Sequence, residues 1–274
     1  MSFVTVLSRS LCAGVLALAS ITGVRAEVLA VGGTGAAGPI VQRLFEAFAQ
    51  QEPGAMLKLV TPPLGSSGGI KAAMAGKLDL GLSGRPLKAD EATQVAAVFV
   101  LADTAFVLAA RDGADGGGMT LAAVADAYAG KLTKWPSGKP IRLILRAAND
   151  SDTDQLRAMS PAMHAAVPLA AERPGMAVAG DDIEALDMLA RTPGALGPTT
   201  LGLLRASGAA LAPLAIDGVT PSPTTLKNGA YPWRKPIYLV VPKNAKGLAE
   251  RFAKWLRSGE ADVVLARYDY LRGR

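Results

Sequence analysis

Apolar residues recur at two spacings from residue 28 onward, and the two spacings alternate along the chain. Short apolar runs bounded by glycine or proline predict buried strands at 28–31, 56–60 and 78–82. Between them, apolar residues three and four positions apart predict helices over 40–48 and 70–75. This order of strands and helices predicts a parallel sheet with right-handed crossover connections.

The rest of the chain continues the same alternation. We expect further strands at 98–101, 104–110, 141–145 and 237–241, and further helices at 120–128, from 151, 181–191 and 248–256. Thr120 is a typical helix N-cap, and either Asp150 or Ser151 caps the helix that follows. The glycine-rich stretch 112–118 predicts a surface loop. No segment repeats at a fixed period, and no linker marks a domain boundary by its composition.

The first 26 residues predict an export signal rather than part of the fold. Arg9 precedes a run of apolar and small residues at 11–24, which is too short to span a bilayer comfortably. The sequence Val24-Arg25-Ala26 is typical of a secretory cleavage site, so we expect cleavage after Ala26 and a periplasmic protein. A signal anchor is the alternative interpretation of the same run.

Composition excludes several classes of protein. Half of the residues are apolar and 19% are charged, which excludes a disordered chain. Lys and Arg number 29 against 23 Asp and Glu, and these basic residues are scattered, so we expect no nucleic-acid partner. With one cysteine and one histidine, a disulfide within the chain and a Cys/His zinc site are excluded, and we expect no metal or other cofactor.

Glycine and hydroxyl residues cluster at three predicted helix starts, at 33–36, 65–68 and 150–153. Each cluster follows a predicted strand. Free backbone N–H groups and the positive end of the helix dipole suit an anion at such a position, and Ser and Thr hydroxyls add donors. In doubly wound sheets such loops gather at the carboxyl ends of the strands. Any one of them alone could be an ordinary cap or turn, but together they predict an anion site.

Two arginines also follow predicted strands. Arg85 comes after the strand at 78–82, and Arg146 comes after the strand at 141–145. The planar guanidinium group can bind an oxyanion through two parallel hydrogen bonds. The alternative for either residue is a surface arginine or one paired with an acidic side chain.

The order of these pieces resembles the substrate-binding proteins of phosphate ABC transporters. The similar segments are GGTGAAGPI (32–40), PLGSSGGIKAAMAGKLDLGLSGRPL (63–87), YAGKLTKWPSGKPIRLILR (128–146), DSDT (150–153), GALGPTTLGLL (194–204) and NGAYPWRKPIYLVV (228–241). The resemblance implies an α/β fold of the type II periplasmic binding class. In this fold two lobes, each a mostly parallel sheet flanked by helices, are joined by two hinge strands. The implied lobes are 27–101 with 234–274, and 102–233.

The resemblance also implies a function. The protein would capture an oxyanion, phosphate, in the cleft between its lobes and deliver it to an ABC permease in the inner membrane. It would act as a monomer and would not be an enzyme. A periplasmic anion sensor or scavenger that is not tied to transport is the alternative.

By the same resemblance, the ligand-binding roles fall on Thr34, Gly35, Ala36, Ser66, Ser83, Arg85, Arg146, Asp150, Ser151, Asp152 and Thr153. The chain departs from the family pattern in two places. Gly84 and Arg85 stand where many phosphate binders have the aspartate that accepts a proton from monohydrogen phosphate. The Arg-x-x-x-Ser-Gly-Thr motif is one residue longer here and carries Asp150 and Asp152. We therefore hypothesise that Asp152 or Asp150 replaces the missing acceptor, the alternative being that Asp150 only caps the helix.

The turn at 31–38 is also similar to the dinucleotide-binding turn of short-chain reductases. Against an enzyme of that kind, the strand at 56–60 ends in Thr61-Pro62 without an acidic or basic partner for a ribose. Tyr128 and Lys131 also miss the Tyr-x-x-x-Lys spacing by one residue. We therefore favour a binding protein.

Overall fold

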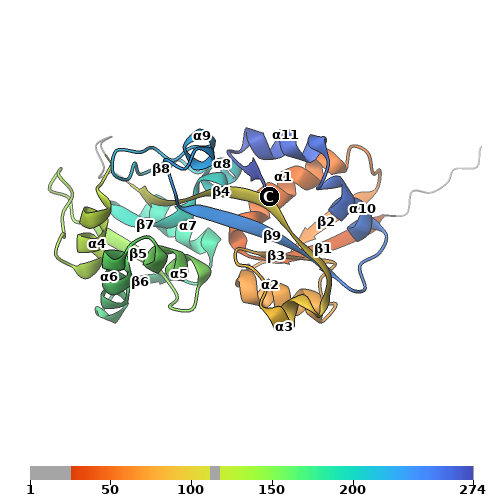
Figure 1. Ribbon diagram of the computed structural model, residues 1–274, viewed down its shortest axis with the longest axis horizontal. Coiled ribbons are helices and arrows are strands. Elements are labelled where there is room, and N and C mark those ends of the chain that lie inside the picture. Colours follow the sequence, from red (N-terminus) through yellow and green to blue (C-terminus); the bar gives the residue numbers. More distant parts are fainter. Residues whose placement is uncertain (1–25, 112–117, 274) are drawn as a thin grey trace, which may run out of the picture.

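The computed structural model describes residues 26–111 and 118–273, and it has two lobes side by side along its longest axis (Figure 1). The strands are β1 Glu27–Gly33, β2 Ala55–Leu59, β3 Leu80–Ser83, β4 Val95–Ala110, β5 Arg142–Arg146, β6 Ala177–Ala179, β7 Ala195–Thr200, β8 Ala212–Pro213, β9 Arg234–Pro242 and β10 Leu271–Arg272. The helices are α1 Gly38–Phe48, α2 Gly65–Met74, α3 Ala89–Ala92, α4 Leu121–Ala129, α5 Ser151–Ala158, α6 Pro161–Glu172, α7 Asp182–Arg191, α8 Leu201–Ser207, α9 Pro223–Lys227, α10 Leu248–Trp255 and α11 Gly259–Arg267, with a 3-10 turn, η1, at Gly35–Ala37.

The sheets confirm the predicted parallel pairing in both lobes. In the first lobe β1 pairs in parallel with β2 and with β3, and in the second lobe β5 pairs in parallel with β6 and with β7. The strands follow the order β2-β1-β3-β9-β4-β7-β5-β6. The predicted two-lobed α/β fold is therefore confirmed.

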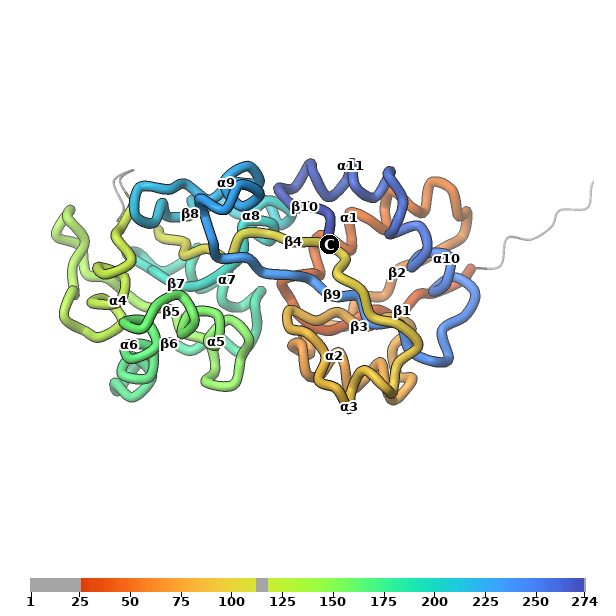
Figure 2. The backbone as a smooth tube through the Cα atoms, viewed as in Figure 1, coloured from red at the N-terminus to blue at the C-terminus, as the bar shows by residue number. Residues whose placement is uncertain are grey.

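Two antiparallel strands, β4 and β9, connect the lobes, and their path between them can be followed in Figure 2. Their pairing runs from Val95 opposite Pro242 to Ala105 opposite Arg234, with irregular steps on the way. The predicted strands at 98–101 and 104–110 are parts of β4, because Asp103 continues the ladder opposite Pro236. The predicted lobe boundaries fall inside β4 and directly before β9, and they stay predictions.

Each lobe has its own hydrophobic core. In the first lobe, α1 and α10 bring four aromatic rings together, and the centroids of Phe48 and Phe252 are 5.0 Å apart. In the second lobe, Phe106 of β4 packs among residues of β5, β7 and the surrounding helices. Burial of this apolar surface is the main force that holds each lobe together.

The lobes also touch along one side, where α8 packs against α1. Tyr270 lies over Gly202 of α8, so closely that a Cβ atom at residue 202 would be 2.1 Å from the Tyr270 Cζ atom. The Tyr270 hydroxyl donates a hydrogen bond of 3.3 Å to the carbonyl oxygen of Ala36. We call this contact between α8, α1 and Tyr270 the packed side of the junction.

Several local expectations need correction or lie outside the described residues. The Gly-Ser segment at 65–68 is the first turn of α2 rather than a loop, so that helix begins five residues before the predicted start. Most of the predicted loop at 112–118 and nearly all of the predicted export signal lie outside the described residues. Within the described ranges, no helix is both long enough and apolar enough to cross a membrane.

Candidate functional site

Segments that are far apart in the sequence meet between the two lobes. Thr34 follows β1 in the first lobe, and its hydroxyl donates a hydrogen bond of 3.1 Å to Asp182 Oδ2 at the start of α7 in the second. Lys235 of β9 donates hydrogen bonds to Ser151 Oγ at 2.9 Å and to Asp152 Oδ1 at 2.7 Å at the start of α5. The two lobes are therefore bridged by polar side chains.

Ser66 of α2 belongs to the same group of residues. Its Oγ atom accepts a hydrogen bond of 2.9 Å from the backbone N–H of Gly84. A Cβ atom at Gly84 would be 2.9 Å from Lys235 Cε and 3.5 Å from Ser66 Oγ, so a side chain at this position would crowd the lysine. We call Thr34, Ser66, Arg146, Ser151, Asp152, Asp182 and Lys235, with the helix cap Asp150, the polar cluster.

Arg146 lies in the polar cluster with only 2% of its side chain exposed. Its Nη2 atom donates a hydrogen bond of 2.8 Å to Asp150 Oδ2 and lies 4.0 Å from Asp182 Oδ1. Burial lowers the pKa of Arg146, but the carboxylates of Asp182 and Asp150 outweigh this effect, so its pKa is raised and the group stays charged. Its Nε and Nη1 atoms are buried without a hydrogen-bond partner among the described residues. Leaving such donors unsatisfied costs about 1–3 kcal/mol each, which favours a ligand that accepts from them.

The residues at the start of α5 form hydrogen bonds that fix the turn between β5 and α5. Asp150 is the N-cap of the helix, since its Oδ1 atom accepts a hydrogen bond of 2.8 Å from the Asp152 N–H. The Thr153 hydroxyl donates to the carbonyl oxygens of Ala147, at 2.8 Å, and Arg146, at 3.3 Å. These bonds fix the turn between β5 and α5 and leave backbone N–H groups of the first helical turn for another acceptor.

Asp182 is a member of the polar cluster that the sequence analysis missed. Its side chain is 8% exposed, and Gly35 lies so close that a Cβ atom there would be 3.1 Å from Asp182 Oδ2. Burial and the negative charge of Asp152 raise the pKa of Asp182 to about 6, while Arg146 lowers it to a smaller extent. At mildly acidic pH this carboxyl is therefore present in both its protonated and its ionised form.

Lys235 was also missed, although the sequence carries a signal for it. Along β9, Lys235 alternates with Ile237 and Leu239, so it lies on the buried face of the strand, and its side chain is 1% exposed. A charged residue at a buried strand position needs a partner of opposite charge, which Asp152 provides. For Asp182 no such signal exists, because Asp181-Asp182 has the sequence of an ordinary helix start.

Three predicted site residues have other contacts. The Arg85 guanidinium group donates two hydrogen bonds to Glu91, at 2.9 and 2.8 Å. It also donates to Ser67 Oγ at 3.1 Å and to the Pro86 carbonyl oxygen at 2.9 Å, so Arg85 is paired with an acidic side chain, as the alternative interpretation held. The Ser83 hydroxyl donates to the Arg85 carbonyl oxygen at 2.7 Å and shapes that turn. Ala36 is buried at the packed side of the junction.

Three cavities border the polar cluster. One of about 250 Å³ lies inside the second lobe, and Arg146, Thr153 and Leu156 are among the residues that line it. A cavity of about 230 Å³, which we call the mouth cavity, lies between α2 and α5 and is lined by Ser66, Ser67, Arg85, Asp150, Ser151 and Asp154 among others. A larger cavity of about 900 Å³, the side cavity, lies between the β1 and β2 ends of the first lobe and α7 of the second. Thr34 is the member of the polar cluster that lines the side cavity.

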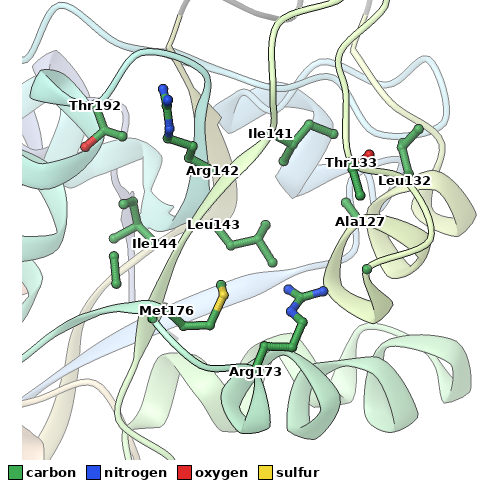
Figure 3. Close-up of a pocket in the computed structure, with 13 residues that line it drawn as sticks. Ala127, Leu132, Thr133, Ile141, Arg142, Leu143, Ile144, Arg173, Met176 and Thr192 are labelled. Atoms are coloured by element: carbon green, nitrogen blue, oxygen red, sulfur yellow. The ribbon is translucent and has the colours of Figure 1, made fainter.

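Another cavity, of about 490 Å³, also lies within the second lobe (Figure 3). Arg142, Leu143, Arg173 and Met176 line it, and no residue of the predicted site does so. The described residues contain no cluster of His, Cys, Asp and Glu arranged to hold a metal ion. The polar cluster is therefore the candidate site.

Residues 20–260 match the family described as PBP superfamily domain. The chain belongs to the PBP superfamily. Among the curated proteins, none matches it. The resemblance seen in the sequence is thus confirmed for the superfamily.

Solved structures similar to this PBP-superfamily chain share its two-lobed fold. A protein of Clostridium perfringens assigned as a phosphate ABC transporter substrate-binding protein, with bound phosphate, has 21% identity and a TM-score of 0.72, over 90% of this chain and 100% of that one. An ABC-type phosphate transport receptor of Vibrio cholerae has 18% identity and a TM-score of 0.61, over 89% and 99%. The periplasmic molybdate-binding protein of Azotobacter vinelandii has 16% identity and a TM-score of 0.60, over 90% and 100%. At these identities the likeness supports the fold alone.

Proposed function

We propose that this PBP-superfamily protein is an exported solute-binding protein that captures an oxyanion, with phosphate as the first candidate, in the polar cluster. The bound oxyanion would then be delivered to an ABC permease. The observation that carries the proposal is Arg146, a buried guanidinium group whose Nε and Nη1 atoms have no partner among the described residues. A tetrahedral oxyanion can accept a charge-assisted hydrogen bond from either of these donors.

Other groups around Arg146 suit the same ligand. Helices α2 and α5 both begin at the junction, and their first N–H groups and positive dipole ends favour a negative charge. The hydroxyls of Ser66 and Ser151 accept hydrogen bonds from the Gly84 N–H and from Lys235, so each keeps its own O–H group to donate to a ligand. The Thr34 hydroxyl can donate to a ligand when its contact with Asp182 is exchanged. Two of the similar structures above are described as phosphate transport proteins and one binds molybdate, and both ligands are oxyanions.

The binding test is isothermal titration calorimetry of the wild-type protein and Arg146→Met with inorganic phosphate, sulfate and molybdate. Hydrogen bonds to a charged group are worth about 1.5–3 kcal/mol, so Arg146→Met should bind at least about 10-fold more weakly. Arg142→Met is the matched control, because Arg142 lies on the same strand but is exposed and lines the cavity of Figure 3. Equal affinity of Arg146→Met and the wild type would refute the role of Arg146.

Export is tested separately from binding. When the full chain is expressed in a Gram-negative bacterium, mass spectrometry of the periplasmic extract should find a protein that begins at Glu27. A chain that keeps residues 1–26 in the membrane fraction would instead support the signal-anchor interpretation.

A further inference from the structure

The polar cluster holds more negative than positive charge. Its carboxylates are Asp150, Asp152 and Asp182, and its cations are Arg146 and Lys235. When all five groups are ionised, the cluster therefore has one negative charge in excess before any ligand binds. An oxyanion adds negative charge to the same place, which is unfavourable at the reduced dielectric constant of a protein interior. A proton that binds together with the oxyanion would offset this charge.

The three carboxylates differ in how directly a cation compensates them. Asp150 Oδ2 accepts a hydrogen bond of 2.8 Å from Arg146 Nη2, and Asp152 Oδ1 accepts one of 2.7 Å from Lys235 Nζ. Asp182 makes no hydrogen bond with a cation among the described residues, since its Oδ1 atom lies 4.0 Å from Arg146 Nη2. Asp182 is therefore the carboxylate of the polar cluster that gains most from a proton.

The other elements around α7 do not supply a second cation. Helix α7 packs against η1, β5, β6 and β7, and of these only β5 has charged side chains, Arg142 and Arg146. Arg142 lines the cavity of Figure 3, so Arg146 is the β5 cation that faces Asp182. Within α7 and its cap, Glu184 and Asp181 add further negative charge beside Asp182.

Asp182 has little contact with water. Its side chain is 8% exposed, and its Oδ2 atom accepts a hydrogen bond of 3.1 Å from the uncharged Thr34 hydroxyl. Burial, and to a smaller extent the charge of Asp182, raise the pKa of the nearby Tyr270 hydroxyl, which therefore stays uncharged. Since burial and Asp152 raise the pKa of Asp182 to about 6, this group is mostly ionised at pH 7 in the ligand-free protein, but a further rise would protonate it.

An oxyanion bound to Arg146 would cause that further rise. The Nε and Nη1 atoms that lack partners belong to the same planar guanidinium group as Nη2, which lies 4.0 Å from Asp182 Oδ1. The ligand would add negative charge beside Asp182, as Asp152 already does, and it would share the positive charge of Arg146, which now lowers the pKa of Asp182. Both effects favour the protonated carboxyl group.

We propose that the polar cluster binds an oxyanion together with one proton, which the Asp182 carboxyl group takes from solvent and holds while the ligand is bound. This inference rests on the proposed function for the oxyanion itself. With Asp182 protonated, two carboxylates face two cations, and the Asp182 O–H group becomes a donor for a ligand oxygen. When the oxyanion leaves, the proton returns to solvent. Asp182 is thus a specificity-determining residue, because it sets the charge that the site accepts.

The first test counts the proton. Isothermal titration calorimetry at pH 7 with sulfate, molybdate and inorganic phosphate is repeated in buffers of different ionisation enthalpy, and the change in binding heat gives the number of protons taken up. For each oxyanion that binds, the wild type should take up at least about half a proton more than Asp182→Asn does. Comparing the two proteins removes any proton that phosphate itself exchanges.

The outcomes of this test separate the two proposals. Binding with equal proton uptake by the wild type and Asp182→Asn would overturn the proton inference and leave the proposed function standing. If none of the three oxyanions binds to the wild type, the proposed function itself fails. Asp187→Asn is the matched control, because Asp187 lies on the same helix but is exposed and pairs with Arg191. This variant should take up as many protons as the wild type, and a loss of uptake in both variants would contradict the role of Asp182.

The second test follows affinity against pH. The ligand-bound protein holds the proton more tightly than the ligand-free protein does, so affinity should fall as the pH rises above about 6. For sulfate or molybdate we expect a decrease of several-fold between pH 7 and pH 8 in the wild type and in Asp187→Asn, and no decrease in Asp182→Asn. A wild-type affinity that does not change over this range would overturn the proposal.

A third measurement needs no variant that binds. If Asp182→Asn binds none of the oxyanions, infrared difference spectra of the wild type at pH 7 decide. Addition of the oxyanion that the wild type binds should produce the carbonyl band of a protonated carboxyl group, and this band should shift in heavy water. A spectrum without that band would show that no carboxyl group is protonated on binding, and it would overturn the proposal.

Discussion

At the scale of single residues, Asp182 shows how burial gives an ordinary acid a pH-dependent effect on folding. Its pKa is raised from 3.8 in the unfolded chain to about 6 in the folded protein, chiefly by burial. The folded state therefore holds the proton more tightly than the unfolded state does. As pH rises from about 4 to about 6, the contribution of Asp182 to the free energy of unfolding falls, and above that range it stays at its lowest value.

The variant Asp182→Asn, which has no titrating group, should not show this fall. Relative to the wild type, its free energy of unfolding should increase between pH 4 and pH 7 by about 1–3 kcal/mol, because one pKa unit corresponds to about 1.4 kcal/mol. Urea unfolding of the ligand-free protein at several pH values measures the difference. Asp126→Asn, a change at an exposed residue, is the control, and a constant difference for Asp182→Asn would contradict the raised pKa.

How far single site residues can be predicted depends on where their partners lie in the sequence. Arg146, Asp150 and Ser151 form one strand end and one helix start, so the local sequence is enough to place them together. The contact between Thr34 and Asp182 joins residues 148 positions apart, and that between Lys235 and Asp152 joins residues 83 apart. For Arg85 the sequence left both interpretations open, because it does not show where the Glu91 side chain lies.

At the scale of elements, ion pairs tie helices and strands together. The pair between Lys235 of β9 and Asp152 of α5 is the clearest example, since both side chains are at most 3% exposed. Removing water from two charges costs free energy that their attraction only partly recovers. Removing one partner of such a pair therefore lowers the free energy of unfolding more than removing both partners does.

A double-mutant cycle tests this property. Lys235→Met and Asp152→Leu should each lower the free energy of unfolding by about 3–5 kcal/mol, because each leaves a buried charge without its partner. The double variant should lose clearly less than the sum of the two. Additive losses in urea unfolding would mean that the two side chains do not interact in the folded protein.

A second pair, Arg85 with Glu91, fixes α3 to the turn after β3. The hydrogen bond from Arg85 lowers the pKa of Glu91 from 4.5 to about 2, against the effect of burial. The contribution of Glu91 to stability is therefore complete above about pH 4.5 and is lost as the pH falls toward 2. Glu91→Gln should cost about 1–3 kcal/mol at pH 7 and clearly less at pH 3, as measured by urea unfolding.

The control for this pair is Glu46→Gln, because Glu46 pairs with Arg43 on the exposed face of α1. Exposed pairs contribute about 0–1 kcal/mol, so this variant should unfold almost as the wild type does at both pH values. A cost of Glu91→Gln that does not change with pH would show that its effect comes from packing rather than charge.

The positions of strands and helices were predictable where hydrophobic periodicity determines them. They were less predictable where contacts with distant residues determine the length of an element. The parallel strands β1, β2 and β3 are apolar runs, and the structure places them close to the predicted positions. β4 is longer than either predicted piece, because Asp103 remains in the ladder through its ion pair with Arg234 at 2.9 Å. That stabilisation comes from a distant residue and leaves no periodic pattern.

At the scale of the whole molecule, the two sides of the junction between the lobes differ in kind. On the packed side, Tyr270 and Gly202 are in close contact, and α8 lies against α1. On the other side, the lobes meet through the polar cluster and its cavities. Hinge motion of a two-lobed protein is absorbed by a few residues of the connecting segments, which here are β4 and β9.

Gly202→Ala tests the packed side. Its Cβ atom would overlap the Tyr270 ring, and overpacking of this kind costs about 1–3 kcal/mol. Gly259→Ala is the matched control, because a Cβ atom at that helix start meets no atom within 4 Å. Thermal unfolding should show a lower melting temperature for Gly202→Ala only, and an unchanged value would mean that the contact is loose in solution.

The difference between the two sides of the junction determines where a ligand of the proposed function would enter and leave. If β4, β9 and the packed side stay together while the lobes rotate, the molecule separates only along the edge where α2 faces α5. A dissolved ion would then arrive and depart past Ser67 and Asp154, which line the mouth cavity at that edge. A bulky label attached there should slow both steps, whereas one on Ser207 at the end of α8 should leave the exchange rate unaltered.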